Sequence, residues 1–134
     1  MARAAIWTAA TVALLTITAC ASTDPGSETA GASTPRQCFT ANNVRNFRVV
    51  DSRTVNVRAG RQVYRLDMFG NCPDLRWTEG MALTTTGGPT VCTGSGLGTN
   101  VVIRGTTGPQ RCSVQTVTLL TPEEVEALPA RNRP

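Results

Sequence analysis

Apolar and polar side chains alternate in short stretches along residues 47–119, with glycine, proline and aspartate between the stretches. Alternation with a period of two is typical of strands that have one face on a core and the other in water. In residues 62–68, for example, Tyr64, Leu66 and Met68 share one face. The pattern predicts strands at residues 47–50, 54–57, 62–68, 81–85, 90–93, 101–104 and 113–119.

The first three of these stretches follow each other closely, because only tight turns at residues 51–53 and 59–60 separate them. Such spacing predicts an antiparallel meander, with Phe47 and Tyr64 inward. The chain is therefore expected to be mainly β: a small antiparallel barrel or sandwich of about six or seven short strands, two disulfides and one short C-terminal helix.

The helix is predicted just after the last strand. Thr121 is a suitable N-cap, Pro122 suits the first helical position, and Glu124 stands three residues after the cap, as in a capping box. Pro129 should end the helix after about two turns, so that it packs over one end of the sheet. Residues 130–134 are expected to fray.

The N-terminal residues have the pattern of an exported protein. Arg3 is followed by an uncharged, apolar and threonine-rich run over residues 4–19, which is shorter than a bilayer-spanning helix and predicts a signal peptide at residues 1–19. The end of the run, Ile17-Thr18-Ala19-Cys20, resembles the lipobox of bacterial lipoproteins. The resemblance implies cleavage before Cys20 and acylation of its thiol; the alternative is a secreted protein without lipid.

Residues 20–36 are rich in serine, threonine, alanine, glycine and proline, a composition that favours a flexible linker over a packed structure. With Cys20 acylated, this segment is a lipid-anchored tether. The remaining residues, 37–134, are expected to form a single small β domain.

Without Cys20, the chain keeps an even set of cysteines: Cys38, Cys72, Cys92 and Cys112. An even set in an exported chain predicts two disulfides. A metal site is the weaker alternative, because the chain has no histidine and no closely spaced cysteine pair. Three connectivities are possible, and we favour Cys38 with Cys72 and Cys92 with Cys112.

All thirteen basic residues are arginine. From residue 37 onward there are eleven arginines and seven acidic residues, which leaves a net charge of +4. Arg48, Arg58 and Arg65 are expected on the outward face of the meander, where guanidinium groups could bind an anionic envelope component such as a lipid phosphate. The alternative is an ordinary solvated strand face. Nucleic acid is not an expected partner in this compartment.

Candidate catalytic groups are few. The chain has no histidine and no lysine, so a hydrolase would need a pair of carboxylates from Asp51, Asp67, Asp74 and Glu79, which stand in turns or at outward positions. We therefore predict no catalytic residue and no cofactor. Residues 94–98 are glycine-rich but lack the spacing of a phosphate-binding loop, so they predict a flexible hairpin connection. Trp77 is expected in the core.

Several short motifs occur together: an early C-F, a V-D-x-x-T-V turn, Y-R-L before C-P-x-L, a third cysteine, and R-C-x-V leading to L-T-P-E-E. Across residues 38–128 this set resembles a family of small exported Gram-negative bacterial proteins that is classed only as a domain of unknown function. The resemblance implies a fold and a location but no activity. Ala21, after the lipidated cysteine, resembles the signal for default sorting to the outer membrane.

The expected function is therefore that of a lipid-anchored, non-catalytic binding or structural module at the periplasmic face of the outer membrane. Two alternatives remain, an envelope hydrolase with a carboxylate pair and a small inhibitor or accessory factor of another envelope protein. A hydrolase should bring two acidic side chains together in a pocket. An inhibitor should display an exposed loop such as residues 94–100.

Overall fold

The computed structural model describes residues 35–134. The predicted signal peptide, Cys20 and nearly all of the predicted linker lie outside the described residues. Within the described part, no helix has the length and apolar character needed to cross a bilayer. The strands are β1 (Cys38–Thr40), β2 (Val44–Val49), β3 (Thr54–Ala59), β4 (Gln62–Met68), β5 (Met81–Thr85), β6 (Thr90–Cys92), β7 (Gly94–Ser95), β8 (Thr99–Gly105) and β9 (Gly108–Leu120).

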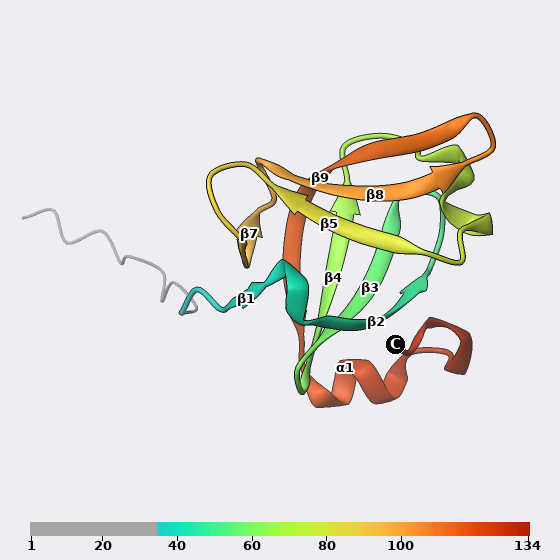
Figure 1. The fold of residues 1–134 in the computed structure, drawn as a ribbon. Helices are drawn as coiled ribbons and strands as arrows, with labels where there is room; N and C mark the ends of the chain where they lie inside the picture. The colour runs from blue at the N-terminus through green and yellow to red at the C-terminus, as the bar shows by residue number, and fades with distance from the viewer. Residues whose placement is uncertain (1–34) are drawn as a thin grey trace, which may run out of the picture. The chain divides into compact units, whose positions relative to one another are not determined.

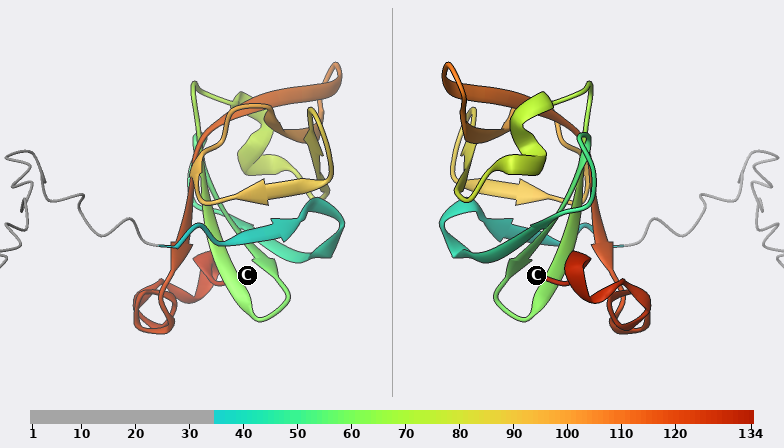
Figure 2. Two further views of the ribbon diagram at one scale, coloured as in Figure 1. Left: turned by 90° about the vertical axis from the view of Figure 1, so that its left-hand side faces the viewer. Right: turned by 90° about the vertical axis from the view of Figure 1, so that its right-hand side faces the viewer.

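The strands form an antiparallel sheet that curls into a half-barrel (Figures 1 and 2). The strand order is β2-β3-β4-β9-β8-β5, and the short β7 also pairs with β9. The long strand β9 holds the two halves together, because its first part pairs with β8 and its second part with β4. A separate pair, β1 and β6, completes the β structure. The predicted fold class is confirmed.

The core lies on the concave side of this sheet. Tyr64, Leu66 and Met68 on β4 are buried there, as the alternation predicts, together with Val55 and Val57 on β3. The Tyr64 hydroxyl donates a hydrogen bond to Gln62 Oε1 at 2.7 Å, and burial raises the pKa of Tyr64. The polar end of this large side chain is thus satisfied inside an apolar core.

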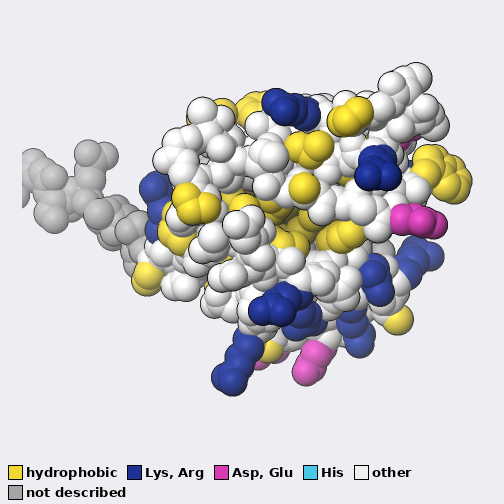
Figure 3. Space-filling model, in the orientation of Figure 1, with side chains coloured by type: hydrophobic (Ala, Val, Ile, Leu, Met, Phe, Trp, Pro, Cys, Tyr) yellow, Lys and Arg dark blue, Asp and Glu magenta, His cyan; other side chains and the backbone are white. Residues whose placement is uncertain are grey.

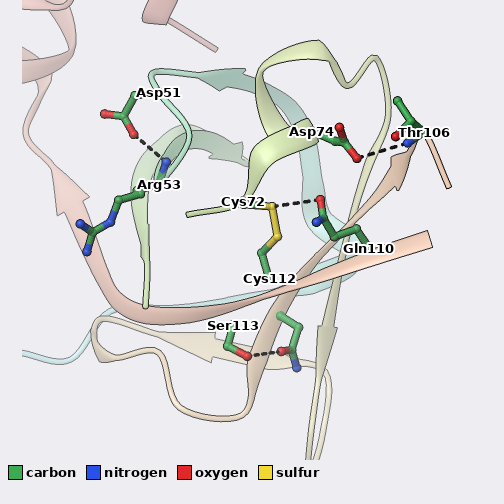
Figure 4. The surroundings of a disulfide bond; sticks show 9 residues. Asp51, Arg53, Cys72, Asp74, Thr106, Gln110, Cys112 and Ser113 are labelled. Carbon is green, nitrogen blue, oxygen red and sulfur yellow. Dashed lines mark hydrogen bonds between the residues drawn. A yellow bond between two sulfur atoms is a disulfide. The ribbon is translucent and has the colours of Figure 1, made fainter. Parts of the chain in front are cut away.

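Both disulfides are present, but the favoured pairing is wrong. Cys38 is bonded to Cys92 and Cys72 to Cys112. The first bond forms because β1 and β6 pair with Cys38 directly opposite Cys92. The second joins the 3-10 helix η2 (Pro73–Trp77), which follows Cys72 and lies against β8, to the neighbouring strand β9 (Figure 4). All four thiols are used in these bonds.

The C-terminal helix is confirmed as α1 (Pro122–Ala127). The Thr121 side chain accepts a hydrogen bond from the Glu124 backbone N–H at 3.2 Å, and the Glu124 carboxylate accepts one from the Thr121 N–H at 2.7 Å. The predicted capping box is therefore formed. Hydrogen bonds from its own backbone N–H and from Thr121 hold the pKa of Glu123 below its usual value, so a negative charge stays at the helix start.

The expectation that residues 130–134 fray is wrong. They form the 3-10 helix η3 (Ala130–Asn132) and two further residues, and both Asn132 and Pro134 are buried. The side-chain amide of Asn56, on the outward face of β3, donates to the Asn132 carbonyl at 3.0 Å. Arg58 Nε donates to the Pro134 carbonyl at 2.9 Å. The segment is held by these polar contacts, which the apolar pattern does not reveal.

The prediction for Trp77 is also wrong, because this side chain is 83% exposed. Leu75 is the buried residue of η2, and one short turn cannot direct both side chains into the core.

The glycine-rich residues 94–98 are held more firmly than expected. A Cβ atom at Gly96 would come within 2.4 Å of Val114 Cγ1, and the Gly96 N–H donates to the Gln115 carbonyl, so only glycine fits against β9 here.

Candidate functional site

The described surface has a groove of about 1200 Å³. It lies where the turn between β3 and β4, the end of β9 and α1 meet, at the bottom of Figure 1. Pro35, Arg36 and Gln37, the first described residues, form part of its wall. Its volume is slightly above the roughly 300–1,000 Å³ of typical small-molecule sites. The predicted tether therefore joins the domain at the edge of this groove.

The apolar floor of the groove follows from strand geometry. Val63 and Leu120 face each other across β4 and β9, on the outward side of the sheet, because their neighbours Tyr64 and Leu119 point toward the core. Both are nevertheless buried, and Pro122 and Val125 of α1 line the groove beside them. The helix thus covers an apolar strip outside the main core and forms one wall of the site.

The rim of the groove is positively charged. Arg36, Arg58 and Arg61 line it, and among residues 35–134 Glu126 on α1 is the only acidic residue that does so. Arg61 is exposed at the turn between β3 and β4, whereas Arg58 is half-buried through its hydrogen bond to Pro134. An apolar floor with several guanidinium groups at its edge suits a ligand that carries both an apolar part and an anionic group.

The sequence analysis named Arg48, Arg58 and Arg65 as an anion-binding face. The structure places all three on the outward face of the meander, with Arg48 and Arg65 opposite Asn56 on either side. Asn56 itself is fully buried, and Arg65 Nε lies 3.4 Å from its side-chain oxygen. The C-terminal segment therefore covers part of this face. Arg58 is the residue of the three that also lines the groove.

Two candidate catalytic carboxylates, Asp51 and Asp67, line a smaller hollow at the turn between β2 and β3. Each already accepts a local hydrogen bond: Asp51 Oδ1 from the Arg53 N–H at 2.7 Å (Figure 4), and Asp67 Oδ1 from the Thr54 hydroxyl at 3.0 Å. These contacts stabilise the turn and the strand pair.

Asp74 accepts a hydrogen bond from the Thr106 N–H at 3.2 Å, and so joins η2 to the turn between β8 and β9 (Figure 4). Glu79 is exposed just before β5. Within residues 35–134, no three histidine, cysteine or acidic side chains gather in a way that could hold a metal ion. None of the four predicted disulfide cysteines lines the groove, although Gln37 and Thr93, next to Cys38 and Cys92 in the sequence, do.

The loop at residues 94–100, which an inhibitor should display, is exposed in part: Gly94, Ser95, Leu97 and Gly98 are exposed, whereas Gly96 and Thr99 are buried. Leu97, between β7 and β8, is the large apolar side chain of this loop and is 74% exposed. The loop is therefore a firm turn with one projecting apolar residue.

Sequence reasoning did not find the groove. Its rim brings together Arg36, from the expected tether, and Arg61, from a turn, which are far apart in the sequence and carry no shared motif. The signal that could have pointed to it is Val63, an apolar residue on the otherwise polar face of β4. An apolar side chain at such a position indicates that another element covers it.

Comparison with known proteins gives a family but no activity. Neither a curated protein nor a solved structure matches the chain. A family model described as a family of unknown function, DUF6491, matches residues 1–133, almost the whole sequence. With this coverage, the chain belongs to that family.

Proposed function

We propose that this protein is a lipid-anchored, non-catalytic binding module of the cell envelope, held at the periplasmic face of the outer membrane, and that its groove takes an anionic component of that envelope. The observation that carries the proposal is the groove itself, where the described lining has Arg36, Arg58 and Arg61 around an apolar floor and Glu126 as its single acid. The lipid anchor rests on the resemblance of Ile17-Thr18-Ala19-Cys20 to a lipobox.

The two parts of the proposal fit each other. Residues 20–36 would join the anchor to the domain, and residues 35–37 line the groove. The groove is thus lined by the residues of the domain that are nearest in sequence to the proposed lipid anchor. Each arginine near an anionic membrane surface contributes about 1 kcal/mol of attraction, so a cluster of three favours an anionic amphiphile over a neutral one.

The hydrolase alternative has less support. Asp51 and Asp67 share a hollow, but both are acceptors in local hydrogen bonds and the hollow is lined mainly by polar side chains. A glycosidase pair needs one carboxyl group that stays protonated in an apolar setting. The described residues give the groove, where the apolar surface lies, no carboxylate pair, because Glu126 is the single acid among them that lines it.

Replacing Cys20 with serine should release the protein from the membrane fraction of its host. Several acyl chains, each methylene worth about 0.8 kcal/mol, hold a domain on a bilayer, whereas the protein without them keeps only its electrostatic attraction. The measurement is fractionation at high salt, with the wild type as reference. Continued membrane association of the variant at high salt would show that the anchor lies elsewhere.

Replacing Arg61 with glutamate should weaken binding of the full chain to vesicles that contain phosphatidylglycerol by roughly tenfold, because a rim charge is reversed. The experiment is a vesicle sedimentation assay on protein that also carries Cys20→Ser, so that the acyl chains do not mask the effect. Binding should also weaken with salt.

Arg111→Glu provides the matched control, since Arg111 is exposed on β9 away from the groove lining and the variant has the same net charge. Equal losses for Arg61→Glu and Arg111→Glu would indicate attraction by net charge alone. Binding of the protein to neutral phosphatidylcholine vesicles as strong as its binding to phosphatidylglycerol vesicles would contradict an anionic ligand.

A further inference from the structure

The half-barrel is open between its two edge strands, β2 and β5. Phe47 on β2 is only half-buried, whereas Val57, opposite it on β3, is fully buried. Leu83 on β5 is likewise half-buried, while its partner Val101 on β8 is not exposed at all. Figure 3 shows hydrophobic side chains on the floor of a hollow between these strands. The apolar core thus reaches the surface along this opening.

The two edges of the opening differ in how they are protected. Strand β2 carries two exposed arginines, Arg45 and Arg48, and an irregularity in its register at Val44 and Asn46. Charges and bulges are the usual means by which proteins prevent strand addition at an edge. Strand β5, with the sequence Met-Ala-Leu-Thr-Thr, has no charge and no proline, and it pairs in regular register with β8. Among the described residues, no strand pairs with its other edge.

The opening is bounded at one end, since the 3-10 helix η1 (Ala41–Asn43) leads into β2 and lies against β5. Figure 3 shows basic side chains both above and below the apolar hollow. Neither β2 nor β5 contains an acidic residue, and the nearest acids in the sequence are Asp51, just after β2, and Glu79, just before β5. The surroundings of the opening are therefore complementary to a negatively charged occupant.

We infer that the free edge of β5 binds an extended, acidic peptide segment of a partner protein by strand addition. The segment pairs with the backbone of β5, places alternate apolar side chains against Phe47 and Leu83, and directs its acidic side chains toward Arg45 and Arg48. An added strand forms main-chain hydrogen bonds with the free edge and places every second side chain on one face. It can therefore use both the unpaired backbone of β5 and the apolar hollow beside it. The site is separate from the groove under α1, so the inference stands independently of the proposed function.

The test uses the full chain with Cys20→Ser and an eight-residue peptide in which valine and glutamate alternate. Amide chemical shifts recorded by NMR during titration should change mainly in β5 and in the facing residues of β2. The backbone amides of β5 that point away from β8 should also become more protected from hydrogen exchange, because they gain partners. A peptide with lysine in place of glutamate, and one with a central proline, should bind at least about fivefold more weakly.

Arg48→Glu should weaken binding of the valine–glutamate peptide about fivefold, whereas Arg111→Glu, with the same net charge, should leave it close to wild type. Arg48 and Arg111 are both exposed, and unchanged circular dichroism and amide spectra would show that the variants fold. Three outcomes would overturn the inference: shift changes centred on α1 and the groove, equal binding of the lysine peptide, or the same shifts produced by phosphatidylglycerol vesicles without peptide.

Discussion

Replacing both Cys72 and Cys112 with alanine should lower the free energy of unfolding by about 4 kcal/mol. The disulfide closes a loop of 40 residues, and its removal restores the conformational freedom of that loop in the unfolded chain. Both cysteines are buried, so lost packing adds to the effect. For a domain of this size the thermal midpoint should fall by roughly 15 °C or more. Calorimetry of the oxidised proteins measures this difference.

The matched control is the double alanine variant at Cys38 and Cys92. This bond closes a loop of 54 residues, so the chain-entropy effect is similar, but Cys38 is exposed and less packing is lost. We expect the variant at Cys72 and Cys112 to be the less stable of the two. An unchanged midpoint for wild-type protein after complete reduction would contradict a stabilising role for either bond.

Replacing Asn56 with alanine should cost about 1–3 kcal/mol of stability, a fall in midpoint of roughly 5–15 °C. Asn56 is fully buried on the outward face of β3, and its amide donates to the Asn132 carbonyl. The substitution leaves that carbonyl without its partner at a covered site, which costs more than the loss of an exposed hydrogen bond. Chemical denaturation at neutral pH measures the change.

Asn42→Ala serves as the control, since Asn42 is exposed in η1, and it should change stability by no more than about 0.5 kcal/mol. Deletion of residues 130–134 gives a second test, because Asn56 and this segment act together. The deletion combined with Asn56→Ala should cost less than the sum of the two separate changes. Full additivity would mean that Asn56 stabilises the fold through some other contact.

Much of the β structure is predictable from alternation alone. Residues 62–68 and 81–85 are predicted with the bounds that β4 and β5 have, because apolar side chains at every second position require one buried face. The helix is predictable from Thr121 and Glu124, whose capping contacts are local in sequence. β9 begins at Gly108, five residues before the predicted start at Ser113. Gly108 and Pro109 at its start favour a turn, so the alternation does not reveal that the strand begins there.

The failures concern contacts between distant segments. Alternation shows which face of a strand is buried but not which strand lies beside it, so the disulfide pairing could not be derived from spacing. The burial of Asn56 under Asn132 could not be predicted for the same reason. An asparagine on the polar face of a strand is expected to be exposed to solvent, and the carbonyl that it binds is 76 residues away in the sequence. The arginines of the groove rim come together for the same reason, through tertiary structure without any motif.

The place of β9 in the sheet also bears on how the chain can fold. β9 is the last strand in the sequence but a central strand in the sheet, where it pairs with both β4 and β8. A chain that is delivered gradually from its N-terminal end therefore contains two separate halves of a half-barrel until residues 108–120 arrive. Their apolar faces stay uncovered during this time, and closing loops of some 50 residues between β4 and β9 makes the last step slow. For such a chain, a chaperone that shields these apolar faces matters more before β9 is available than afterwards.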